Sequence, residues 1–124
     1  MNLTAVLDHT ALTALYRADP FFIGLYIETH AAPAASWSPS LSVLAAEQLV
    51  AGAGRHAAPL RFAGVIPFIT AHAVDAMDWP TTHWPVAHAA AVAWQALKAG
   101  EPLTVLSLEP ELYAETGITP LNPS

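Results

Sequence analysis

Four side chains in this sequence have the types and positions to form a metal-dependent hydrolytic site. Asp8 ends a short apolar run, and Glu109 stands just past a second one. Glu47 lies on an otherwise apolar predicted helix, and His88 lies in the first turn of another. Carboxylates suit Mg²⁺ or Mn²⁺, and such an ion activates water for phosphodiester hydrolysis. In this interpretation Asp8, Glu47 and Glu109 are the metal ligands, and His88 is a fourth ligand or a water-positioning base.

Each of these residues also has a purely structural interpretation. Asp8 has the residue type and position of a helix N-cap. Glu109, before Pro110, places a favourable negative charge at a helix N-terminus. Glu47 can face solvent at the edge of its helix, although an unpaired acid on an apolar face is costly. His88 can be a core or surface histidine that binds no metal.

Composition indicates one globular domain spanning residues 1–124. Hydrophobic residues make up 54% of the chain and charged residues 11%, which excludes a disordered chain and favours self-association or a permanent partner. The net charge of −6, with four basic residues, counts against nucleic-acid binding through phosphate neutralisation.

The absence of cysteine is consistent with a reducing compartment, and we see neither a signal peptide nor a membrane span. A soluble cytoplasmic protein is therefore expected.

Apolar runs and helix-capping patterns alternate along the chain. We predict buried strands within 2–8, at Phe62–Ile69 and at Leu103–Leu108, a very short strand at Trp37, and an edge strand at Ile118–Leu121. The predicted helices are 10–17, 20–29, 40–50, 70–77 and 85–99, with one helical turn from Pro110 to Tyr113 and a loop at Arg55–Arg61. This alternation predicts a three-layer α/β/α sandwich with a mainly parallel central sheet.

In such a sheet the carboxyl ends of the strands share one edge, where ligands bind. Asp8 and Glu109 follow the first and third clear strands, so we expect their carboxylates to lie at the same edge. We expect the Ser107 hydroxyl to contact the metal ligands rather than the ion, and so to hold them in position.

The order and setting of these residues resemble a PIN domain, and more narrowly the virulence-associated toxin ribonucleases of type II toxin–antitoxin pairs. The resemblance covers nearly the whole chain. It is carried by Val6–Leu7–Asp8–His9–Thr10–Ala11–Leu12, by Ser38–Pro39–Ser40–Leu41 leading to Ala46–Glu47, by Thr104–Val105–Leu106–Ser107–Leu108–Glu109–Pro110–Glu111–Leu112–Tyr113, and by Gly117–Ile118–Thr119–Pro120–Leu121. It implies a Mg²⁺- or Mn²⁺-dependent endoribonuclease, usually dimeric and held inactive by an antitoxin peptide.

The sequence departs from the family pattern at two acids. His88 stands where the family has its third acid, and Glu109 replaces the usual aspartate of the last position. Histidine is a softer ligand than a carboxylate and favours Mn²⁺ or another transition ion over Mg²⁺.

Three functions follow as hypotheses. The first is a toxin-type, metal-dependent endoribonuclease with a partly substituted acidic site. The second is a catalytically inactive PIN-like scaffold that serves as a protein–protein interaction or regulatory module. The third is a regulatory metal-binding module without turnover. The expected partners are a second copy of the chain and an antitoxin-like protein, with RNA required only by the first hypothesis.

Overall fold

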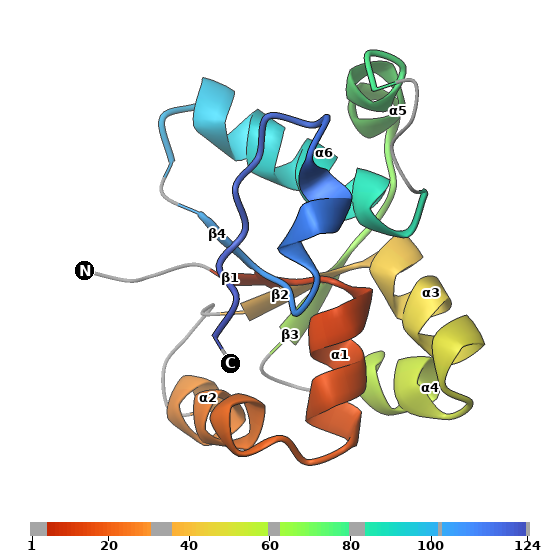
Figure 1. The fold of residues 1–124 in the computed structure, drawn as a ribbon, viewed down its shortest axis with the longest axis vertical. Helices are drawn as coiled ribbons and strands as arrows, with labels where there is room; N and C mark the ends of the chain where they lie inside the picture. The colour runs from red at the N-terminus through yellow and green to blue at the C-terminus, as the bar shows by residue number, and fades with distance from the viewer. Residues whose placement is uncertain (1–4, 31–35, 60–62, 80–83, 102, 124) are drawn as a thin grey trace.

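The computed structural model describes residues 5–30, 36–59, 63–79, 84–101 and 103–123, and it has a mixed α/β fold with a parallel sheet (Figure 1). The four strands are β1 (Ala5–Leu7), β2 (Ser36–Pro39), β3 (Ala63–Ile66) and β4 (Thr104–Leu106). They lie in the order β3-β2-β1-β4, and every neighbouring pair is parallel. The predicted α/β class and parallel sheet are confirmed, including the short strand at Trp37. Residues 2–4 of the first predicted strand lie outside the described residues.

Strand β1 lies between two partners, which explains its continuous apolar sequence. Val6 pairs with Trp37 of β2 and with Val105 of β4. The segment 118–121, predicted as an edge strand, forms only an isolated bridge between Leu106 and Leu121. The bridge consists of the Leu121 amide donating to the Val105 carbonyl at 2.8 Å and the Ser107 amide donating to the Leu121 carbonyl at 3.1 Å.

The helices follow the predicted positions closely. They are α1 (His9–Tyr16), α2 (Pro20–His30), α3 (Ser40–Leu49), α4 (Ala53–Ala57), α5 (Thr70–Ala76) and α6 (Trp84–Lys98), with the 3₁₀ helix η1 at Pro110–Tyr113. No helix among the described residues has the length and apolar character needed to cross a bilayer.

Helix α4 is the main difference from the predicted elements, because a loop was expected at 55–61. Gly52 has a φ of 97°, which turns the chain sharply after α3. Gly54 then packs directly against α3, where an added Cβ would lie 2.7 Å from the Cβ of Glu47. Gly52, which follows α3, is thus also the N-cap residue of α4.

The core consists of two apolar clusters that share β1 and β4. Ala5, Leu7 and Leu106 belong to a cluster with residues of α1, α3 and α4, whereas Val6 and Val105 belong to another with residues of α6. Because side chains alternate along a strand, these clusters lie on opposite faces of the sheet. Figure 1 shows α6 and α1 on opposite sides of β1.

We expect Gly54→Ala to lower the free energy of unfolding by about 2 kcal/mol, because the new methyl group must displace α3 or α4. Gly24→Ala is the matched control, since an added Cβ in the middle of α2 meets nothing within 4 Å. It should stabilise the chain by about 0.5–1 kcal/mol through its higher helix propensity. Urea denaturation of both variants measures the difference, and equal stability would contradict the described packing of α4.

Candidate functional site

The Asp8 carboxylate is completely buried at the junction of β1 and α1. Its Oδ1 accepts hydrogen bonds from the Thr10 amide at 2.9 Å, the Thr10 hydroxyl at 2.6 Å and the Ala11 amide at 3.0 Å. Its Oδ2 accepts a hydrogen bond from the Tyr113 hydroxyl at 2.7 Å. Asp8 is thus an N-cap for α1 and, through Tyr113, a link to η1.

The Tyr113 hydroxyl is a fixed donor in this arrangement. Burial, together with the adjacent Asp8 carboxylate, raises the pKa of Tyr113 far above its ordinary value. The phenol therefore stays protonated and continues to donate to Asp8. Oδ1 of Asp8 accepts three hydrogen bonds and Oδ2 accepts one, and the whole side chain is buried, so the protein rather than solvent surrounds this carboxylate.

Ser107 and Thr10 extend this hydrogen-bond network to the end of β4. The Thr10 hydroxyl accepts a bond from the Leu108 amide at 2.8 Å and lies 3.3 Å from the Ser107 hydroxyl. The Ser107 hydroxyl accepts a bond from the Glu109 amide at 3.1 Å. Ser107 thus lies close to the Asp8 network, but its hydroxyl fixes the backbone after β4.

Glu47 joins α3 to α4. Its carboxylate accepts bonds from the backbone amides of Gly52 at 2.8 Å and Arg55 at 2.9 Å, and it forms an ion pair with the Arg55 guanidinium at 3.1 Å. The two backbone hydrogen bonds are the main reason why the pKa of Glu47 is lowered. No lysine or arginine lies within four positions of Glu47 in the sequence, because its basic partner lies eight residues away on the next helix.

His88 is buried near the ends of β2 and β3. Its Nδ1 accepts a hydrogen bond from the Leu41 amide at 3.2 Å, and its ring packs against His72 and Phe68, with centroids 4.7 and 5.0 Å away. Burial, and next the neighbouring His72, lower the pKa of His88 from 6.5 to about 4. His88 is therefore a neutral core histidine at neutral pH.

Glu109 is the one member of the predicted set whose carboxylate has no partner among the described residues, and it is exposed. Across the described ranges, no three histidine, aspartate or glutamate side chains come close enough to hold one metal ion. The Mg²⁺ or Mn²⁺ site expected from Asp8, Glu47 and Glu109, with His88 beside it, is therefore not found there. Asp8, Glu47 and His88 each bind protein groups instead.

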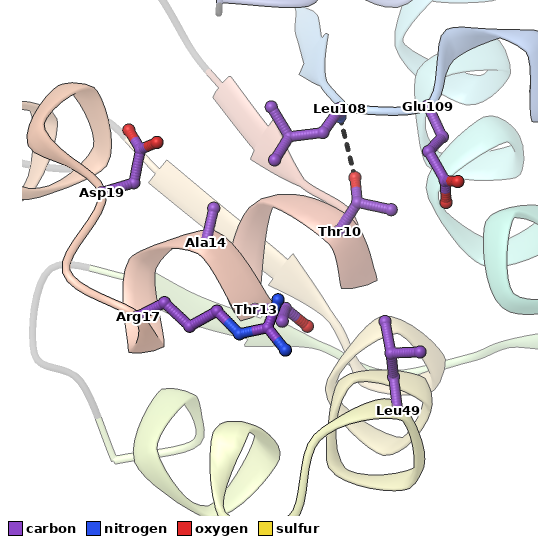
Figure 2. Close-up of a pocket in the computed structure, with 8 residues that line it drawn as sticks. All are labelled: Thr10, Thr13, Ala14, Arg17, Asp19, Leu49, Leu108 and Glu109. Carbon is purple, nitrogen blue, oxygen red and sulfur yellow. Dashed lines mark hydrogen bonds between the residues drawn. The ribbon is translucent and has the colours of Figure 1, made fainter.

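A groove of about 410 Å³ lies along α1 and reaches the end of β4 (Figure 2). Its lining residues are Thr10, Thr13, Ala14, Arg17, Asp19, Leu49, Leu108 and Glu109. Figure 2 shows the side chain of Arg17 extending past Thr13, and that of Glu109 projecting from the segment after β4. Sequence analysis missed Arg17 and Tyr113, because nothing in their spacing relates them to the strand ends.

No family model matches this chain, and neither does any curated protein or solved structure. The role of each residue therefore rests on its geometry.

We expect Asp8 and Tyr113 to be energetically coupled in folding. Tyr113→Phe should cost about 1–3 kcal/mol by leaving a buried carboxylate oxygen unsatisfied. Asp8→Ala should cost more, because it removes the cap of α1 as well and leaves the phenol without its acceptor. In the double variant the losses should fall short of their sum by about 1 kcal/mol or more. Chemical denaturation of the three variants measures this coupling, and strict additivity would rule out the hydrogen bond as a stabilising contact.

The free energy of unfolding should fall as the pH decreases from 7 to 4. In this window the unfolded chain protonates His88 near its ordinary pKa of 6.5, whereas the folded chain keeps it neutral down to about 4. The loss should be on the order of 3 kcal/mol.

His88→Asn should flatten this dependence while keeping an acceptor for the Leu41 amide. His56→Asn is the control, since His56 is exposed on α4 and should leave the slope unchanged. Urea titrations at a series of pH values compare the three proteins, and an unchanged slope in His88→Asn would refute the assignment.

Proposed function

We propose that this chain is a catalytically inactive PIN-like module that acts by binding a protein partner. The observation that carries the proposal is the state of Asp8, the first acid of the predicted site. Its carboxylate is buried and accepts hydrogen bonds from four protein donors, so it stabilises the fold. A metal-dependent nuclease needs carboxylates that are free to bind an ion at an open site.

The arrangement of the core supports a PIN-like, three-layer α/β/α organisation as the fold part of this proposal. Two apolar clusters lie on opposite faces of β1 and β4, one of them with α1 and the other with α6. The parallel sheet with helical connections is the arrangement that the family resemblance implies.

Exposed apolar side chains support binding of a protein. Ile69, Val74 and Met77 on and beside α5 are 50%, 53% and 76% exposed, and Trp84 at the start of α6 is 47% exposed. Exposed apolar side chains of this size are stabilised when another protein surface removes them from water. The partner class that we propose is therefore a protein, whether a second copy or an antitoxin-like chain.

Titration with Mn²⁺ separates this proposal from the nuclease hypothesis. We expect no saturable calorimetric heat with the wild-type chain, and no cleavage of a mixed RNA pool in the presence of Mn²⁺. Glu109→Gln and the matched variant Glu111→Gln, an exposed acid two residues further on, should be indistinguishable from wild type in both assays. Saturable Mn²⁺ binding together with RNA cleavage that Glu109→Gln abolishes would overturn the proposal in favour of the endoribonuclease.

A further inference from the structure

Among the basic residues that the structure describes, Arg17 differs in having no ion-pair partner. Arg55 forms an ion pair with Glu47, and Lys98 forms one with Asp75 at 2.9 Å. The Arg17 guanidinium has no carboxylate within ion-pair distance among the described residues, although the chain carries ten acids. This unpaired cation lines the groove along α1.

The other end of the groove carries a free negative charge. Glu109 lines it beside Leu108, whose amide is bonded to Thr10 in the first turn of α1. Asp19 also lines the groove, but one of its oxygens accepts a hydrogen bond from the Phe21 amide at the start of α2. Figure 2 shows the Asp19 carboxylate directed away from the Arg17 guanidinium, which leaves the guanidinium available.

The surface between the two charges is apolar or already hydrogen-bonded. Ala14, Leu49 and Leu108 supply apolar contacts, and the Thr13 hydroxyl donates to the His9 carbonyl. The Thr10 hydroxyl donates to Asp8 and accepts from Leu108. Strong polar recognition is thus confined to the two ends of the groove.

The two ends are separated by nearly two turns of α1. Thr10 and Arg17 are seven positions apart, which at the helical rise places their Cα atoms about 10 Å apart along α1. An extended chain spans about 3.3–3.6 Å per residue, so a tripeptide covers this length. The groove volume of about 410 Å³ also falls within the usual range of small-ligand sites.

We propose that the groove binds a small zwitterion of tripeptide length, with its carboxylate at Arg17, its ammonium group at Glu109 and an apolar side chain over Leu49 and Leu108. The guanidinium suits a carboxylate because it offers several N–H donors in one plane. This ligand site goes beyond the proposed function and does not depend on it.

The probe is the tripeptide Ala-Leu-Ala with free termini, compared with its N-acetylated and C-amidated forms. Titration of the isotope-labelled full chain, followed by amide NMR shifts, should show perturbations at Thr13, Ala14 and Arg17. Each capped form should bind about fivefold more weakly, as expected for the loss of one exposed charge contact.

Variants assign each terminus to its residue. Arg17→Gln should bind the free acid and the amide equally, and Glu109→Gln should bind the free amine and the acetylated form equally. Arg55→Gln and Glu111→Gln are matched controls outside the groove and should retain both preferences. Asp19→Asn should bind the free acid more tightly, because it removes a negative charge and keeps an oxygen for the Phe21 amide.

Three results would overturn the proposal: no binding of the free tripeptide, equal binding of all three forms by wild type, or unchanged preferences in Arg17→Gln and Glu109→Gln. Failure here leaves the Mn²⁺ and RNA assays unaffected, so the ligand site and the absence of nuclease activity are judged separately.

Discussion

The buried Asp8 carboxylate is the interaction on which the rest of this fold depends. It lies where β1 becomes α1, and it accepts hydrogen bonds from the first turn of that helix and from η1, more than a hundred residues later. A buried carboxylate is tolerated only when its oxygens are satisfied. Thr10, Ala11 and Tyr113 must therefore keep their positions, which fixes the end of the chain against its beginning.

Glu47 repeats the same principle between α3 and α4. Its carboxylate gathers the amides that follow α3 and pairs with Arg55, so the short helix α4 is attached to α3 by charge-assisted hydrogen bonds. In both places an acid that resembles a metal ligand in the sequence stabilises the turn at the end of a secondary-structure element. The partners of both carboxylates are N–H and O–H groups of the protein.

His88 illustrates how burial changes the chemistry of a side chain. Desolvation lowers the pKa of His88, and its Nδ1 accepts a hydrogen bond from the first turn of α3. The buried His88 ring thus fits an environment made by the rings of Phe68 and His72. Arg17 and Glu109, which have no ion-pair partner among the described residues, line the groove beside α1.

The sequence by itself determined the α/β class and the order of β1 to β4 and of the described helices other than α4, because apolar runs, proline at helix starts and glycine at helix ends act over a few residues. It also identified Asp8 as a candidate helix cap, since the following residues supply the amides. Only the tertiary structure decided which groups each acid meets. Tyr113 reaches Asp8 and Leu41 reaches His88 through packing between elements distant in sequence, and Arg55 reaches Glu47 because α4 folds back against α3. Whether a carboxylate is free for chemistry depends on these long-range donors, and no local pattern records them.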